Sequence, residues 1–355
     1  MPRIVSVATA VPAHELAQEA SMAMARHFFQ DAFPDINRLL TVFSHSQIRK
    51  RHFCMPADWF FEEHGFAEKN RLYVEHAEAL GAEAAVRCLE RGGSSPSDID
   101  CLLFVSSTGL STPSIDARLL NRLGMRPDIA RIPLWGLGCA GGAMGLARAS
   151  EYVRAYPEKR ALLVCVELCG LTFIRNDRSK SNLIATCLFG DGAAAALIEG
   201  DAVPRGHRAQ TELSISRSES RTWPDTLDVM GWELTDDGLK VIFSRDIPQL
   251  ISASLRENID RFLAKADAPL SEVSRFLFHP GGAKVLAAYQ KALDLSEGAT
   301  RFSADVLREY GNMSSPTVLF VLEKSLEHPW RAGEKGLLAA LGPGFSSEFL
   351  LLEAR

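Results

Sequence analysis

Cys139, which opens a glycine-rich stretch, is the residue of this sequence best placed to do chemistry. Residues 135–150 read WGLGCAGGAMGLARAS, and the strand-like residues 132–135 lead into them. This pattern predicts a sharp turn from a strand into a helix, with the thiol in the first helical turn. Free N–H groups and the positive end of the helix dipole would stabilise the reactive thiolate there. The alternative is a buried structural cysteine, the commoner role of an unpaired cysteine.

Two further residues could act together with this thiol. His279 follows the strand-like residues 276–278, and Asn312 stands at the start of a helix that we expect to run to about residue 326. A histidine beside a cysteine can form a thiolate–imidazolium pair, and asparagine donates a hydrogen bond without adding charge. Taken singly, His279 could equally be a core histidine and Asn312 a helix cap.

A cysteine, a histidine and an asparagine together suit the chemistry of thioesters. If an acyl group were bound to Cys139, His279 and Asn312 could both donate to the thioester carbonyl of an incoming malonyl group. They would then stabilise the enolate that forms when carbon dioxide leaves, which is catalysis of the oxyanion type. A cysteine protease uses the same three residue types beside an open peptide cleft. That alternative gives no role to the glycine loops or to the internal duplication described below.

Continuous apolar runs predict strands that are buried on both faces of a sheet, and helical periodicity lies between them. The predicted strands lie at 2–10, 101–105, 161–167, 188–198, 276–278, 336–341 and 345–352. Helices are expected at 72–91, 114–123 and 247–266, in addition to those after Cys139 and Asn312. This alternation predicts an α/β protein.

The second half of the chain repeats the order of the first. Strand 101–105 corresponds to 276–278 and 161–167 to 336–341, and the strand after Gly-Asp-Gly, expected at an edge of the sheet, corresponds to the strand after Gly-Pro-Gly. The two helix starts would then place Cys139 and Asn312 face to face across a pseudo-dyad, with His279 between them. A shift to proline, glycine and charge at 200–206 predicts halves at 1–205, with the cysteine, and 206–355, with the other two residues.

Composition and charge exclude several classes of protein. Of the 355 residues, 46% are hydrophobic and 23% are charged, and the formal net charge is −5, which gives no general attraction to nucleic acid or membrane. Seven cysteines without a framework spacing, and no signal peptide, predict free thiols in a reducing cytoplasm. No zinc site is expected, and no apolar run approaches the roughly 20 residues of a membrane span. The basic cluster 47–52 is either a solvated face or a phosphate contact.

Five motifs in a fixed order make the sequence similar to a known family. They are GCAGG at 138–142, LFGDGAAA at 188–195, FHPGG at 278–282, YGNMSS at 310–315 and GPGF at 342–345. The sequence resembles the type III polyketide synthases, the chalcone and stilbene synthase family, over nearly its whole length. The resemblance implies a thiolase-like αβαβα five-layer fold and an obligate homodimer. It also implies iterative decarboxylative condensation of malonyl-CoA onto an acyl-CoA starter, with no metal or organic cofactor.

The same resemblance assigns roles to residues. Cys139 would be the acyl-carrying nucleophile, His279 and Asn312 the decarboxylation and oxyanion pair, and Phe189 an aromatic gate between the CoA tunnel and the cavity. The remaining residues expected to contact substrate are Ser107, Thr108, Cys169, Thr172, Val241, Ser314, Gly342, Pro343 and Gly344. Of the family's CoA-binding lysines, one position holds Arg38, and Arg49 is a further candidate for a phosphate contact.

Departures from the family pattern bear on the substrate. Val241 stands where a second gating phenylalanine is usual, which would widen the passage, and Trp232 stands where plant members have glycine. Residues 230–246 look most like bacterial members that accept long fatty acyl starters and release alkylpyrones or alkylresorcinols. We therefore expect a medium- or long-chain fatty acyl-CoA starter.

Related condensing enzymes provide the alternatives. A ketoacyl synthase III of fatty-acid synthesis shares the three residue types but performs one condensation onto a carrier protein. The Pro-Gly-Gly after His279 favours the polyketide branch. A thiolase would need a second catalytic cysteine near the C-terminal glycine loop, and none follows Cys187. A non-catalytic homologue is disfavoured because all three residues are present.

Overall fold

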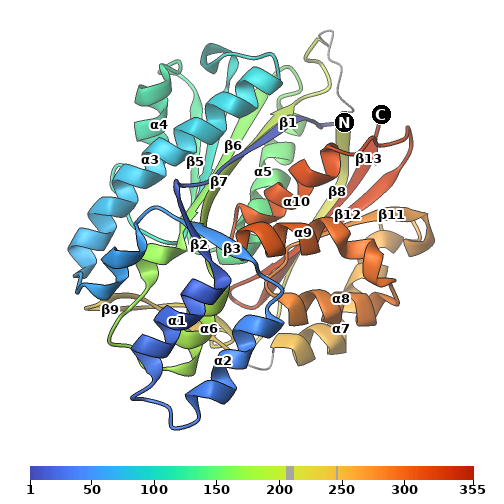
Figure 1. The fold of residues 1–355 in the computed structure, drawn as a ribbon. Coiled ribbons are helices and arrows are strands. Elements are labelled where there is room, and N and C mark those ends of the chain that lie inside the picture. Colours follow the sequence, from blue (N-terminus) through green and yellow to red (C-terminus); the bar gives the residue numbers. More distant parts are fainter. Residues whose placement is uncertain (205–211, 245–246) are drawn as a thin grey trace.

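A computed structural model describes residues 1–204, 212–244 and 247–355 of the chain. Its main feature is a nine-stranded sheet of the order β11-β12-β13-β8-β1-β7-β6-β4-β5 (Figure 1). The strands are β1 (Arg3–Ala10), β4 (Cys101–Val105), β5 (Ala130–Leu134), β6 (Arg160–Leu168), β7 (Asp191–Glu199), β8 (Leu213–Thr222), β11 (Val273–Phe278), β12 (Lys335–Gly342) and β13 (Ser346–Ala354).

The sheet consists of two halves with the same pairing. In the first half β4 runs parallel to β6, which is antiparallel to β7, which is antiparallel to β1. In the second half β11 runs parallel to β12, which is antiparallel to β13, which is antiparallel to β8. The halves join where β1 pairs with β8 through two residues of each strand. The order of strands thus repeats as the sequence indicated, although β7 lies inside the sheet and not at an edge.

Helices form three layers around the two half-sheets. The helices are α1 (Gln18–Phe29), α2 (Ile36–His45), α3 (Phe66–Arg91), α4 (Ile115–Leu123), α5 (Gly141–Ala155), α6 (Lys180–Leu188), α7 (Ile247–Ala264), α8 (Ala283–Leu293), α9 (Arg301–Tyr310) and α10 (Thr317–Leu326). Helices α5 and α10 share one apolar core with strands of both halves, α3 and α4 cover the outer face of the first half, and α7 and α8 cover that of the second (Figure 1). These are the five layers of the thiolase-like αβαβα fold.

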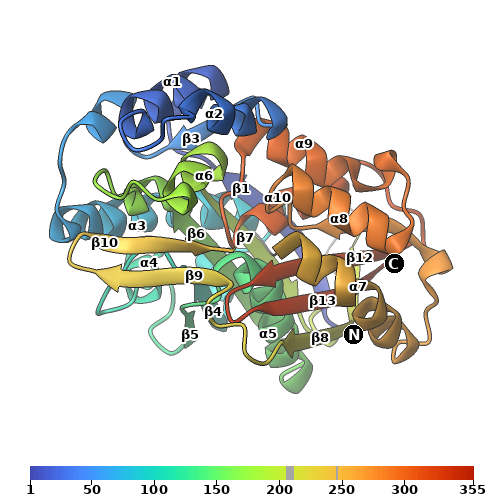
Figure 2. The same cartoon turned by 90° about the horizontal axis from the view of Figure 1, so that it is seen from below.

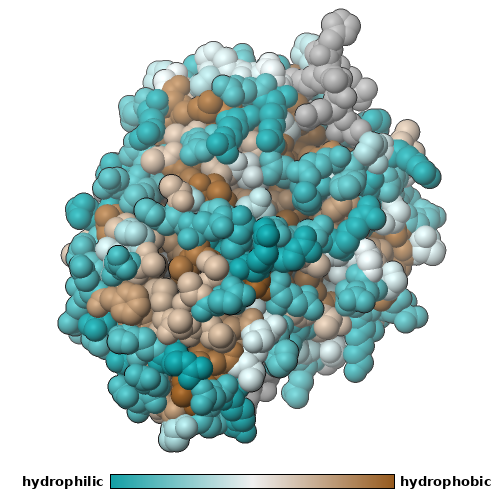
Figure 3. All heavy atoms as spheres, viewed as in Figure 1, coloured by the Kyte–Doolittle hydropathy of each residue, from teal (hydrophilic) through white to brown (hydrophobic). Residues whose placement is uncertain are grey.

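Two additions lie on this framework beside the site. The short strands β2 (His14–Ala17) and β3 (Lys50–Phe53) pair with each other, with β2 against α1 and β3 against α9 and β7. The hairpin of β9 (Met230–Thr235) and β10 (Gly238–Phe243) lies alongside α6 (Figure 2). On the face shown in Figure 3, apolar side chains gather low on the left, where Figure 1 has α1.

Some predicted boundaries differ from the structure. Helix α3 begins at Phe66, six residues before its predicted start at Leu72, and α10 begins at Thr317, so that Asn312 precedes the helix instead of opening it. The predicted boundary at 205/206 lies outside the described residues. Among the described residues, no helix is both long and apolar enough to cross a membrane.

Candidate active site

Cys139 lies in a single turn of 3-10 helix, η3 (Gly138–Ala140), between β5 and α5. The glycines around it allow close packing. A Cβ on Gly142 would lie 2.2 Å from the carbonyl oxygen of Ser315, and Gly138 adopts a φ of +46° against the ring of Pro343. The glycine-rich stretch therefore brings the start of α5 against the segment that precedes α10.

Asn312 lies directly opposite the thiol. The Sγ of Cys139 is 3.9 Å from both polar atoms of the Asn312 amide. The Oδ1 atom accepts a hydrogen bond of 2.8 Å from the N–H of Ser314, which identifies Nδ2 as the donor on the other side. That Nδ2 also donates to the carbonyl of Gly281 at 3.3 Å. The residue is thus oriented to donate toward Cys139, although it does not lie at a helix N-terminus.

His279 completes the group at the carboxyl end of β11. Its backbone N–H donates to the carbonyl of Ala339 at 2.8 Å, which anchors it beside β12. Its side chain is 3% exposed, and neither ring nitrogen has a hydrogen-bond partner among the described residues. Buried polar atoms are usually paired, so an imidazole with two open nitrogens is suited to bind a ligand.

The three residues line one small cavity with an empty volume of about 320 Å³ that includes its open part. Its other lining residues are Met230, Phe243, Ile247, Gly281, Val285, Tyr289 and Leu341. We call it the cysteine chamber. Cys139 comes from the first half of the chain, and His279 and Asn312 come from the second, so the chamber exists only because the halves pack together.

Burial disfavours the charged forms of both Cys139 and His279 in the cysteine chamber. It raises the pKa of Cys139 to about 11, while hydrogen bonds from Ser314 and Asn312 act to lower it. Burial also lowers the pKa of His279 to about 3. The thiol pKa is therefore raised and not lowered as we expected from a helix start, because burial outweighs these hydrogen bonds. A thiolate therefore requires an imidazolium beside it, and the pair can form by transfer of one proton without a change in net charge.

Glu167 is a buried carboxyl behind the chamber and was not among the site residues predicted from the sequence. It accepts hydrogen bonds from the Ser107 N–H at 2.8 Å and from the hydroxyls of Thr108 and Ser315, both at 2.9 Å. Burial raises the pKa of Glu167 to about 7. The sequence does contain a signal for Glu167. It is an acid at the end of an apolar strand, next to a strand that ends in polar residues.

Several predicted substrate contacts lie behind the chamber. The Thr108 hydroxyl and the Ser107 backbone N–H both donate to Glu167, and the Ser107 hydroxyl accepts from the N–H of Gly138 at 3.0 Å. A Cβ on Gly342 would lie 2.6 Å from the Cβ of Ala140, so the loop Gly342, Pro343 and Gly344 supports the turn that bears the cysteine. None of these five residues lines the cysteine chamber, whereas Ser314 lies close enough to the thiol to act on its pKa.

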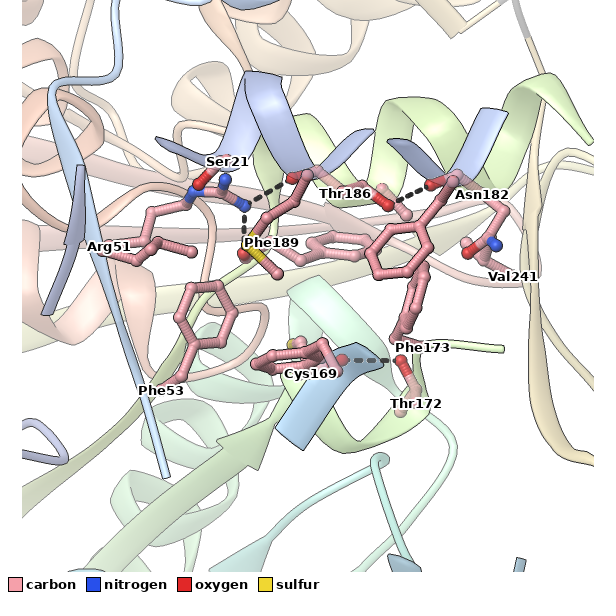
Figure 4. A pocket seen from close by; sticks show the side chains of 16 residues that line it. Ser21, Arg51, Phe53, Cys169, Thr172, Phe173, Asn182, Thr186, Phe189 and Val241 are labelled. Carbon is pink, nitrogen blue, oxygen red and sulfur yellow. Dashed lines mark hydrogen bonds between the residues drawn. The ribbon is translucent and has the colours of Figure 1, made fainter. Parts of the chain in front are cut away.

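A second, apolar cavity lies on the other side of Phe189, with an empty volume of about 560 Å³ that includes its open part (Figure 4). Its lining is Leu16, Ser21, Met24, Phe28, Arg51, Phe53, Phe60, Cys169, Gly170, Thr172, Phe173, Asn182, Ala185, Thr186, Phe189 and Val241. We call it the phenylalanine cavity. Four of these residues (Cys169, Thr172, Phe189 and Val241) were predicted from the sequence. The four phenylalanines from α1, β3, η1 (Ala57–Phe61) and the segment after η4 (Cys169–Thr172) were not.

A small apolar cluster lies between the linings of the two cavities: Cys169, Phe189 and Val241 of the phenylalanine cavity, with Trp232 and Phe243 packed against them. The ring centroid of Phe189 lies 6.1 Å from that of Trp232 and 6.4 Å from that of Phe243. Phe243 lines the cysteine chamber, and it stands two residues after Val241 on the same face of β10. Phe243 thus places a ring against Phe189 although Val241 itself has none. We call this cluster the junction.

The two arginines expected to bind CoA lie on the surface. Arg38 is 78% exposed in its side chain and pairs with Asp35 at 2.7 Å, and Arg49 pairs with Glu309. Neither lines the chamber or the phenylalanine cavity. Within the described residues, no group of His, Cys, Asp and Glu side chains could hold a metal ion.

Comparisons with known proteins agree with this geometry. The sequence profiles described as the N-terminal and C-terminal domains of chalcone and stilbene synthases match residues 2–202 and 214–354. The chain is 46% identical to the "Putative chalcone synthase" of Bacillus subtilis, over 99% of this chain and 98% of the Bacillus protein. It is 36% identical to the "1,3,6,8-tetrahydroxynaphthalene synthase" of Streptomyces peucetius, over 98% and 92% of the two chains. The crystal structure of 1,3,6,8-tetrahydroxynaphthalene synthase from Streptomyces coelicolor, a bacterial type III polyketide synthase, superposes with a TM-score of 0.94 at 29% identity and covers 99% of both chains.

Proposed function

The chain belongs to the chalcone and stilbene synthase family, the type III polyketide synthases, and on that premise we propose that it extends a fatty acyl starter on Cys139 by repeated condensation with malonyl-CoA. The product would be an alkylpyrone or an alkylresorcinol. Members of this family are acyltransferases that act on CoA thioesters and need no other cofactor. The observation that carries the proposal is an apolar cavity whose wall residue Phe189 packs against Phe243 of the cysteine–histidine–asparagine chamber.

Loading of the starter would use the thiol and the imidazole. The Sγ of Cys139 attacks the carbonyl carbon of the acyl-CoA as its proton passes to the neutral ring of His279. The bond to the CoA sulfur then breaks, and the imidazolium returns the proton to the leaving thiolate. The open ring nitrogens of His279 support this role, because no other described side chain occupies them.

Extension would use His279 and Asn312 as hydrogen-bond donors. Both donate to the thioester oxygen of malonyl-CoA, so that the electrons of the breaking carbon–carboxylate bond flow into an enolate while carbon dioxide leaves. The enolate carbon attacks the acyl carbonyl on Cys139 and expels the thiolate. The product is a CoA thioester longer by one acetyl unit, which can return to Cys139 for the next round.

The phenylalanine cavity supports an aliphatic starter. Its walls carry few polar side chains, and the rings of Phe53, Phe173 and Phe189 face into it (Figure 4). Burial of each methylene group contributes about 0.8 kcal/mol, so affinity would grow with chain length until the cavity is full. Ser107, Thr108 and Gly342–Gly344 would contribute indirectly, through the turn that bears the cysteine.

The surface arginines and the sheet edge suggest further contacts. Arg38 and Arg49 remain candidates for binding the CoA phosphates. Each would have to leave its surface ion pair, which costs little free energy to break. A homodimer is supported by β5, an edge strand that is followed by Trp135 with 54% of its surface exposed. The seven unpaired cysteines are in keeping with a reducing cytoplasm.

The test is a panel of acyl-CoA starters from about eight to about eighteen carbons, with malonyl-CoA and mass analysis of products. We expect several extensions per starter and alkylpyrone or alkylresorcinol masses. Turnover of phenylpropanoid-CoA but of none of the fatty acyl-CoAs would refute the proposal of a fatty acyl starter. Aromatic products from malonyl-CoA alone would favour an activity like that in the names of the tetrahydroxynaphthalene-synthase relatives. A single extension, on malonyl carrier protein only, would favour the ketoacyl synthase III alternative.

A further inference from the structure

Arg51, on β3, is a buried cation that none of the proposed reaction steps uses. It is 1% exposed, and its Nη1 donates to the carbonyl oxygens of Thr186 at 2.8 Å and Phe189 at 2.6 Å (Figure 4). Both carbonyls lie at the C-terminal end of α6, where the last backbone carbonyls of a helix have no N–H partner within the helix. The guanidinium therefore fixes the end of α6 and, directly after it, the backbone of Phe189.

The aliphatic part of Arg51 packs against the segment that bears Asn312. Gly311 adopts a φ of +68°, and a Cβ there would lie 2.7 Å from the Cγ and Cδ atoms of Arg51. The N–H of Asn312 donates to the carbonyl of Leu188 at 2.9 Å, and Asn312 accepts from Gly190 at 3.0 Å. Arg51 thus supports the place where Phe189 and Asn312 run side by side.

Asp191 is a buried acid that holds the part of the junction formed by Cys169, opposite Phe189. Its carboxylate accepts hydrogen bonds from the N–H groups of Gly170 at 2.7 Å and Cys54 at 2.9 Å. Burial raises the pKa of Asp191 to about 6, and the charge of Arg51 acts in the opposite direction. Since Gly170 follows Cys169, the two walls that meet at the junction are each held by one of two oppositely charged buried side chains.

We propose that Arg51 is a positioning residue that sets the opening between Phe189 and Cys169, and thereby selects the length of acyl chain that can span the junction. The inference rests on the proposed function, because an acyl chain must extend from the thiol into the phenylalanine cavity. Displacement of a positioned group by about 1 Å can change a rate by about a hundredfold, so a small movement of the Phe189 backbone is sufficient.

The experiment compares kcat/KM for the best starter with that for a starter shorter by about four carbons, in wild type and in Arg51→Met. Methionine keeps much of the volume of arginine but removes the charge and the donors. We expect the ratio of the two values to fall by about tenfold, within the range by which a few methylene groups are discriminated. In a Phe189→Ala background the same substitution should change the ratio no further, because the residue through which Arg51 acts has lost its ring.

Arg275 provides a matched control. It is 9% exposed and donates to the carbonyls of Ser325 and His328 at the end of α10, and it lines neither cavity. Arg275→Met should lower the melting temperature and leave the ratio unchanged. An Arg51→Met protein that loses stability like the control but keeps the wild-type ratio would overturn the proposal.

Arg51→Lys covers the case in which Arg51→Met does not fold. Lysine keeps the charge but not the planar fork of donors, so we expect a shift in the ratio in the same direction, and a wild-type ratio in this variant would also overturn the proposal. The length profile of the wild-type enzyme separates this test from that of the proposed function. If wild type extends no fatty acyl-CoA, the starter proposal fails by itself, whatever Arg51 does.

Discussion

The two cavities on either side of Phe189 differ in what their walls contain. The cysteine chamber has Cys139, His279 and Asn312, with polar atoms open to a ligand, in about 320 Å³. The phenylalanine cavity has about 560 Å³, and most of its side chains are apolar. Polar groups with defined directions discriminate between bonding patterns, whereas apolar walls discriminate mainly by length and volume. We infer that the chamber determines the reaction and the cavity determines the starter.

This division predicts that the buried thiols of Cys139 and Cys169 are not equivalent. Cys139→Ala should reduce product formation by about a thousandfold or more, as removal of a covalent nucleophile does. Cys169→Ala, in the phenylalanine cavity, should keep turnover within about threefold and change only the starter preference. Mass analysis of the intact protein after incubation with acyl-CoA measures the acyl-enzyme directly. An acyl-enzyme in Cys139→Ala would contradict the assignment.

Removal of a donor from the chamber should affect decarboxylation more than loading. Asn312→Ala should slow release of carbon dioxide from malonyl-CoA by about a hundredfold or more, the usual cost of one oxyanion donor. Starter loading should fall by about tenfold at most, because the thiol and imidazole remain. Asn258→Ala, on the outer helix α7, is the control for loss of a buried asparagine. Equal losses in both half-reactions would contradict the proposed role.

The thiol should depend on His279 for its ionisation. In His279→Gln no imidazolium can form, so we expect the pKa of Cys139 to rise toward the value of about 11 that burial imposes. Alkylation by iodoacetamide at pH 7 should slow accordingly, and its pH profile should move to higher pH than in wild type. Identical profiles in the two proteins would show that another group stabilises the thiolate.

A larger side chain in the apolar cavity should alter selectivity without altering the reaction. Ala185 lines the phenylalanine cavity and packs against the junction. Ala185→Phe should reduce kcat/KM for the longest starters by about ten- to a hundredfold, and leave the shortest starters and malonyl-CoA decarboxylation within about threefold. Ala185→Val should give an intermediate profile. A uniform loss for all starters would indicate damage to the chamber.

Protonation of Glu167 should make the stability of the folded protein depend on pH. The pKa of Glu167 is about 7 in the folded protein and 4.5 in the reference state, so the folded protein binds the proton more tightly. The resulting contribution to the free energy of unfolding is fully present below pH 4.5 and is lost as pH rises to 7. The loss amounts to about 3 kcal/mol. Glu167→Gln should remove this part of the pH dependence of denaturant unfolding between pH 5 and 7. Asp128→Asn, at an exposed carboxyl, is the control and should behave as wild type.

Much of the fold could be predicted from the sequence. Strands such as β4 and β6 are buried on both faces, so their apolar runs are continuous and easy to recognise. Recurrence of the same strand order made the duplication visible before any contact was known. The residues of the cysteine chamber could be named because cysteine, histidine and asparagine at strand ends and glycine turns are a chemically distinctive set.

The surroundings of the chamber depended on tertiary contacts. Ser107 and Thr108 have the polarity of substrate contacts, but the Thr108 hydroxyl donates to Glu167 from the neighbouring strand, and the Ser107 hydroxyl accepts from Gly138. Phe243 packs against Phe189 only because the hairpin of β9 and β10 lies beside α6.

Residue types and local periodicity determined which chemistry this chain can perform. The direction of each side chain was decided by partners far away in the sequence. Arg51 is the clearest case. In the sequence it belongs to a basic cluster that could have been a solvated face. In the structure it is buried because the carbonyls of Thr186 and Phe189, more than 130 residues later, accept its hydrogen bonds. A buried charge is stable only where such partners converge, and that convergence is a property of the folded chain.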